Sequence, residues 1–221
     1  MGKKTLVTVG LVVVVLAVGL LGWYLASRPG EPPKKIAETT TLKKGERSFS
    51  KGAFKDALAD LKKAVEDNPE SFKAHYLLAK SYEALGQLDK ALPEYQRAAK
   101  LDPKNAEVHY NLALLYKEEG DAKKAISELE ESIRIFPNFV GARNLLAKYY
   151  AEQGETAKAI EEYKKIIELK PFGFDLASVH NELGLLYIKE GKKQDAIKEW
   201  QVSLSIDPNN QKAKNLLAQY K

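Results

Sequence analysis

Three histidines, His75, His109 and His180, are the side chains of this 221-residue chain best suited to chemistry near neutral pH. Imidazole binds transition metals and exchanges protons in that range, so a metal site or an acid–base centre would begin with them. His75 and His109 are 34 residues apart, which is also the period of an internal repeat in this chain. Helices of successive repeats pack about 10 Å apart, too far for two such side chains to share a metal. We therefore expect no metal site and interpret the histidines as residues at the edge of the core.

Other catalytic arrangements are missing from the sequence. The chain contains no Cys, which removes disulfides, thiolate metal sites and cysteine nucleophiles. No Gly-rich phosphate loop and no Ser-His-Asp arrangement occurs. Neighbouring carboxylates are common, as in Glu130-Glu131 and Glu161-Glu162, but they follow the pattern of a solvated helix surface. We expect no enzyme, no cofactor and no small-molecule substrate.

The net charge of +5 is concentrated near the N-terminus. Residues 1–35 carry five basic side chains and one acidic side chain, whereas residues 36–221 carry 30 basic and 29 acidic ones. A nucleic-acid-binding protein needs basic residues gathered on one face, where they displace counterions from the phosphates. Here the two signs alternate along the repeats, so we do not expect a nucleic-acid partner.

The elements that must position these side chains come from a repeat of 34 residues. Seven positions of the stretch 106–137 recur one period earlier and one period later, in the order Leu, Ala, Tyr, Gly, Ala, Leu or Tyr, and Pro. In the central copy they are Leu112, Ala113, Tyr116, Gly120, Ala125, Leu129 and Pro137. This period and pattern resemble the tetratricopeptide repeat (TPR) family. In the family pattern Trp holds the position of the three histidines, which here would stand in for an aromatic residue.

The resemblance implies an all-α solenoid in which each unit is a helix-turn-helix and stacked units share a core. We expect five units followed by a capping helix. The units are 38–71, 72–105, 106–139, 140–173 and 177–210, and the capping helix is 211–221. A Gly at position 15 would end each first helix in a left-handed conformation, and a Pro would follow each second helix.

The connection between the fourth and fifth units is three residues longer than the others. Phe172 and Phe174 flank Gly173 there. One interpretation is a longer turn packed against its own chain. The other is an exposed aromatic contact for a partner.

The family resemblance also implies that positions 2, 5, 6, 9 and 12 of the first helices line a concave groove that binds polypeptides. The expected partner-binding residues are Tyr76, Lys80, Tyr110, Asn111, Leu114, Lys117, Asn144, Lys148, Asn181, Leu185 and Asn215. Asn occupies position 5 in units four and five and in the cap. A side-chain amide both donates and accepts, so such a row can pair with an extended peptide backbone, or it can be ordinary polar surface. The residues with which co-chaperones of this family clamp a C-terminal carboxylate match only at Asn111, so no chaperone role is expected.

The N-terminal segment has the composition of a membrane anchor. Residues 6–25 carry no charge and, as a helix, would span about 30 Å, the thickness of the hydrocarbon core of a bilayer. A cleaved signal peptide is the alternative, but its apolar region would be shorter and would end in an A-x-A-like site. We therefore expect a short tail at 1–5, a transmembrane helix at 6–26 and a proline-rich linker at 27–37.

The residues of this anchor also indicate which side of the membrane the repeats occupy and where a second membrane helix could contact the anchor. Lys3 and Lys4 favour a cytoplasmic N-terminus, which would place the repeats outside the cytoplasm, at the inner membrane of a bacterium. The alternative is that the repeats lie at the cytoplasmic face, because basic residues also flank the other end of the segment. Gly19, Gly22 and Ala26 lie on one stripe of mostly small residues, which would let a second membrane helix approach closely. The alternative is that Gly is simply common in membrane helices.

The sequence thus favours a single-pass, membrane-anchored scaffold that binds protein or peptide partners in its groove and recruits or assembles a complex at the membrane. A second interpretation is a structural subunit of a membrane complex, held by its anchor helix and by the convex or end surfaces of the array. These interpretations differ in whether the groove is occupied.

Overall fold

The computed structural model describes the backbone of residues 34–220 and the side chains of residues 40–220. Within this range the chain forms eleven α-helices and no strand. They are α2 (Lys34–Ser50), α3 (Phe54–Asp67), α4 (Phe72–Ala84), α5 (Leu88–Leu101), α6 (Ala106–Glu118), α7 (Ala122–Ile135), α8 (Val140–Glu152), α9 (Thr156–Leu169), α10 (Leu176–Lys189), α11 (Lys193–Ile206) and α12 (Gln211–Tyr220). The predicted all-α solenoid is therefore confirmed over the described residues.

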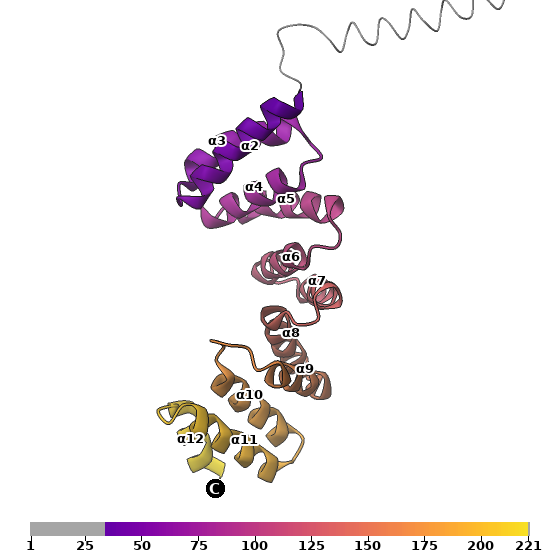
Figure 1. Ribbon diagram of the computed structural model, residues 1–221. Helices are drawn as coiled ribbons and strands as arrows, with labels where there is room; N and C mark the ends of the chain where they lie inside the picture. Colours follow the sequence, from indigo (N-terminus) through magenta and orange to yellow (C-terminus); the bar gives the residue numbers. More distant parts are fainter. Residues whose placement is uncertain (1–33, 221) are drawn as a thin grey trace, which may run out of the picture.

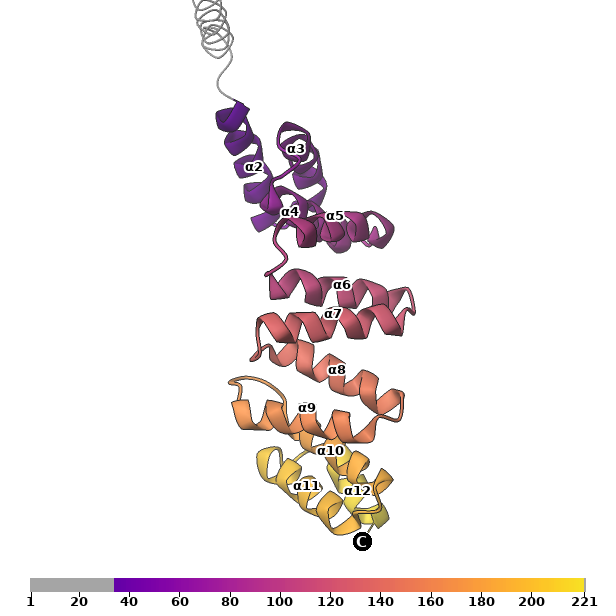
Figure 2. The same ribbon diagram turned by 90° about the vertical axis from the view of Figure 1, so that its right-hand side faces the viewer.

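The helices form antiparallel pairs that stack in chain order into a curved rod (Figures 1 and 2). Each helix from α2 to α11 packs most closely on the other member of its pair, and neighbouring pairs contact each other mainly through one helix of each. In Figure 1 the first helices α6, α8 and α10 follow the inner side of the curve, and the second helices α7, α9 and α11 follow the outer side. The rod begins at α2 and ends at the single helix α12.

The tight turn inside each pair depends on glycine. Gly86 and Gly120 have φ angles of +70° and +76°, a region that side chains with a Cβ rarely adopt. The glycines at the same position of the other three units also have positive φ. This agrees with the prediction from position 15.

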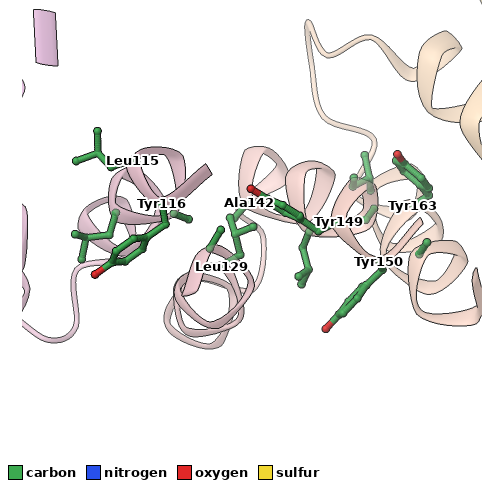
Figure 3. Close-up of a cluster of buried hydrophobic side chains, with 14 of the residues drawn as sticks. Leu115, Tyr116, Leu129, Ala142, Tyr149, Tyr150 and Tyr163 are labelled. Atoms are coloured by element: carbon green, nitrogen blue, oxygen red, sulfur yellow. The ribbon is translucent and has the colours of Figure 1, made fainter. Parts of the chain in front are cut away.

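The core is a continuous column of buried side chains, in which each second helix contributes one small and one bulky residue. In each second helix an Ala with no exposed surface lets the first helix approach, and a bulkier residue four positions later fills the space beside it. The small residues are Ala57, Ala91, Ala125, Ala159 and Ala196, and the bulky ones are Leu61, Tyr95, Leu129, Tyr163 and Trp200. Figure 3 shows the central part of this column, with side chains such as Leu129, Ala142 and Tyr163 filling the space between successive helices.

Two features differ in detail from a regular array. Helix α2 begins at Lys34, inside the segment 27–37 for which the sequence predicts a linker, so its last four residues are helical. Pro93 lies inside α5, which continues on both sides of it.

None of the helices in residues 34–220 is long and apolar enough to span a membrane, and the predicted span at 6–26 lies outside the described part of the chain.

Candidate partner-binding groove

The inner side of the curve carries two adjoining hollows between successive first helices. One, of about 370 Å³, lies between α6 and α8, with Leu145 and Tyr149 among its lining residues. The second, of about 250 Å³, lies between α8 and the start of α10, with Asn144 and Phe174 in its lining. Lys148 lines both hollows, so they are neighbouring parts of one surface. We call this surface the central groove.

The central groove contains cations that the fold has not neutralised. Lys117 and Lys148 are both exposed and form no ion pair with any described residue. By contrast, Lys73 lies 2.8 Å from Glu46, and Lys80 lies 3.4 Å from Glu107. Glu152 also lines the first hollow, and Asp175 and Glu182 line the second, so both signs of charge lie beside the apolar Leu145. The surface suits a peptide that offers a negative charge to the two lysines together with an apolar side chain.

The predicted groove residues on α4, and Asn111 on α6, pack against other side chains of this protein. The ring of Tyr76 is stacked on Phe72 at 5.7 Å, and the amino group of Lys80 lies 5.4 Å from the centre of that tyrosine ring. Burial, together with the hydrogen bond and charge of Glu107, raises the pKa of Tyr76 well above its ordinary value. Asn111 is buried beside them, with no hydrogen-bond partner for its Nδ2 among the described residues. This end of the groove is therefore a packed polar cluster and less open than its centre.

Tyr110 and Leu114, on α6, are half-buried. The ring of Tyr110 lies 4.8 Å from the ring of Phe139, just before α8, and burial raises the pKa of its hydroxyl. Tyr110 therefore helps to stack two units and keeps part of its surface exposed. Both residues remain candidates for contact with a partner.

Asn181 does not occupy the accessible position that the sequence suggested. Only 1% of it is exposed, and its Nδ2 donates to Oδ1 of Asn210 at 3.1 Å. Asn210 also accepts from the backbone N–H of Ala213, so it caps the N-terminus of α12. Asn181 thus joins α10 to the capping helix and is not available to a peptide. Leu185 is half-buried on the same helix.

The two remaining asparagines of the predicted row are accessible. Asn144 is half-buried and lines the central groove. Asn215 is exposed on α12, where its Oδ1 accepts from Nε2 of Gln211 at 2.9 Å. The three asparagines therefore do not form one continuous row of free amides.

The long connection before α10 separates its two phenylalanines. Phe172 is fully exposed, with Gly173 after it at φ +71°. Phe174 is half-buried, packs against the core and lines the central groove. The interpretation as an exposed aromatic residue therefore fits Phe172, and the interpretation as a packed turn fits Phe174.

The histidines make a recurrent contact with a glutamate that the sequence interpretation missed. Each Nδ1 lies 2.6 Å from a carboxylate oxygen of the second helix of its own unit: His75 with Glu94, His109 with Glu128 and His180 with Glu199. In unit four Arg143 takes the same position and pairs with Glu162. The signal was present in the sequence, because a glutamate follows each of these residues by 19 positions. They are therefore side-chain links inside the units, and His75 and His180 are buried at the edge of the core, as expected from the sequence.

No group of three metal-ligating side chains occurs between residues 34 and 220. The predicted membrane-helix positions Gly19, Gly22 and Ala26 lie outside the described residues.

A family model described as a TPR repeat matches residues 45–86 and 82–120, and models described as tetratricopeptide repeats match residues 116–183 and 177–210. Together these matches run without a gap from residue 45 to residue 210. The chain belongs to the tetratricopeptide repeat family. No match was found among curated protein sequences.

Solved TPR structures share the fold of this chain. A crystal structure of the MamA protein is 25% identical, with a TM-score of 0.69, over 84% of this chain and 96% of that one. YrrB, described as a TPR protein with an unusual peptide-binding site, is 19% identical, with a TM-score of 0.70, over 79% and 89%. PilF of Pseudomonas aeruginosa is 22% identical, with a TM-score of 0.63, over 86% and 90%. The TPR family and these neighbours indicate a protein–protein interaction fold.

Proposed function

We propose that this TPR protein is a membrane-anchored scaffold that binds an extended segment of a partner protein in the central groove. One observation carries the proposal: Lys117 and Lys148 stay unpaired over two adjoining hollows, while other lysines of the inner face are neutralised. The amide of Asn144 beside them can pair with the backbone of an extended peptide. The peptide-binding site ascribed to YrrB supports this use of the fold.

The membrane part of the proposal rests on the sequence of residues 1–37. The uncharged segment 6–25 would cross the bilayer, and Gly19, Gly22 and Ala26 would contact a second membrane helix. With Lys3 and Lys4 in the cytoplasm, the array would lie outside it. Protease added to spheroplasts of cells that produce the protein should digest the array, and protection of residues 45–210 would reverse this orientation.

Photo-crosslinking in native membranes tests the groove. A photoreactive residue in place of Asn144 should capture a polypeptide that mass spectrometry identifies. Co-purification of the captured protein should then fall at least about tenfold in the double variant Lys117→Ala/Lys148→Ala, because each lost contact to a charged group weakens binding by about 1.5–3 kcal/mol.

The matched control is Lys100→Ala/Lys123→Ala, which removes two exposed lysines from the second helices α5 and α7. Partner recovery should not change in this variant. If recovery depends on Lys100 and Lys123 and not on the groove, the protein acts through its convex surface, as a structural subunit would.

A further inference from the structure

Four basic side chains lie along one exposed face of the first unit. Lys43, Lys44 and Arg47 are on α2, and Lys51 follows directly after it. Steps of three and four residues place them on the same side of the helix. All four are exposed, and none forms an ion pair with a described residue. We call these four residues the basic stripe.

Among the described side chains of α2, no acidic residue lies on the face of the basic stripe. Glu46, the acidic residue of α2 whose side chain is described, faces α4, where Lys73 lies 2.8 Å away. The other faces of α2 serve the core: Leu42 and Phe49 pack against it, and Gly45 is buried beside Leu61. Folding therefore uses the apolar face of α2 and leaves the four basic side chains of the stripe exposed.

This arrangement differs from that of many surface lysines farther along the array. Lys124 lies 2.8 Å from Asp121, and Lys198 lies 3.2 Å from Asp195, both within one turn of helix. Such local pairs neutralise the surface, as the alternation of charges in the sequence predicts. The basic stripe lacks them, so its charge is available to a partner.

The position of the stripe in the chain indicates the chemistry of that partner. Helix α2 begins nine residues after the uncharged segment 6–25, and nine residues reach at most about 30 Å when extended. The stripe begins nine residues farther along α2, at Lys43, which adds about 14 Å of helix. Segment 6–25 as a membrane anchor would therefore tether the stripe close enough for it to contact the bilayer surface. Basic segments beside an anchor are attracted to anionic headgroups over about a Debye length, about 8 Å at physiological ionic strength.

We infer that the basic stripe docks on the anionic phospholipid headgroups of the membrane that holds the anchor. The first unit would then lie against the lipid surface, with the central groove farther along the rod. This inference rests on the proposed membrane anchor. It adds a lipid-binding surface to a chain that we propose binds a polypeptide in its central groove.

The absence of Cys allows a direct test with a single fluorescent label. Ser50→Cys, beside the stripe, carries the label in the full-length chain reconstituted into vesicles of phosphatidylcholine with or without phosphatidylglycerol. A quencher on the lipid headgroups should reduce the fluorescence about twofold more in the anionic vesicles, and high salt should remove the difference. The control label is Ser205→Cys, another exposed serine whose hydroxyl donates to the carbonyl three residues earlier. Its fluorescence should not depend on the lipid.

Charge variants identify the residues responsible. The quadruple variant Lys43→Gln/Lys44→Gln/Arg47→Gln/Lys51→Gln should lose the lipid-dependent quenching. The matched variant replaces four other exposed lysines without ion pairs, Lys104, Lys123, Lys193 and Lys214, by Gln and should retain it.

Several results would overturn the inference. Equal quenching in neutral and anionic vesicles would do so, as would quenching that survives the quadruple substitution. Stripe-dependent binding of duplex DNA without lipid-dependent quenching would assign the stripe to nucleic acid instead. A full-length chain that does not float with either kind of vesicle would overturn the anchor and this inference together. A chain that floats without quenching would overturn the inference alone.

Discussion

Gly184 leaves the space that the indole of Trp200 occupies. A Cβ at Gly184 would lie 2.8 Å from Cδ1 of Trp200, closer than real Cβ atoms approach other atoms. Units two to four have Ala at the position of Gly184 and a smaller residue at the position of Trp200. These pairs are Ala79 with Tyr95, Ala113 with Leu129, and Ala147 with Tyr163. The larger ring in unit five is therefore matched by a smaller residue opposite it.

The first prediction follows from this match. Gly184→Ala should lower the free energy of unfolding by about 1–3 kcal/mol, because the buried indole must shift to accommodate the methyl group. Combining it with Trp200→Tyr should cost less than the sum of the two single substitutions, since the pair then resembles units two and four. Urea unfolding followed by circular dichroism measures all three variants. Additive losses would contradict the steric link.

The second prediction concerns pH and the pair His109–Glu128. Nδ1 of His109 lies 2.6 Å from Oε2 of Glu128, and Nε2 lies 3.3 Å from the carbonyl oxygen of Pro103. Both ring nitrogens thus face acceptors, which a doubly protonated ring satisfies as a donor on each side. The hydrogen bond to Glu128 is the main reason that the pKa of His109 is raised. The stabilisation should be complete below the unfolded-state pKa of about 6.5 and should be lost as the pH rises through the higher folded-state value.

Unfolding at different pH values checks this expectation. His109→Gln should lose more stability at about pH 6 than at about pH 9, because the charged pair exists only when the ring is protonated. Arg143→Gln is the control, since Arg143 pairs with Glu162 at the same position of unit four and stays charged throughout. It should cost about 1–3 kcal/mol at both pH values, because Glu162 loses a buried partner and keeps only Lys165, 3.2 Å from its Oε1. Equal losses for His109→Gln at both pH values would show that its ring folds neutral.

The sequence predicted the fold well because the turn and the close helix contact each allow only certain residue types, which recur at fixed positions of the repeat. Gly120 must adopt a positive φ, and Ala125 must be small, and both requirements restrict residue type. The groove was harder to predict. Position 5 gave Asn144 and Asn181 the same expected role, yet the second is buried. Asn181 donates to Asn210, the residue that caps α12, and periodicity within one unit does not reveal this contact with the element after it.

The third prediction tests this contact. Asn210→Ala should cost about 1–2 kcal/mol, because it removes the cap of α12 and leaves Nδ2 of Asn181 without an acceptor. Hydrogen exchange should show the loss first as faster exchange in α12. Asn215→Ala, on the exposed face of α12, should stay within about 0.5 kcal/mol of the parent. Equal effects of the two substitutions would mean that the link between Asn181 and Asn210 does not hold the cap.

The fourth prediction separates the two phenylalanines of the loop before α10. Phe172→Ser should leave the free energy of unfolding within about 0.5 kcal/mol of the parent, because the ring is fully exposed and has no packing to lose. Phe174→Ser should cost about 1–3 kcal/mol, because its ring packs against the core and leaves a gap when removed. Thermal and urea unfolding of both variants measures the difference. A contact between Phe172 and a partner would weaken partner recovery in Phe172→Ser at unchanged stability, whereas an effect confined to Phe174→Ser would assign the loop to folding alone.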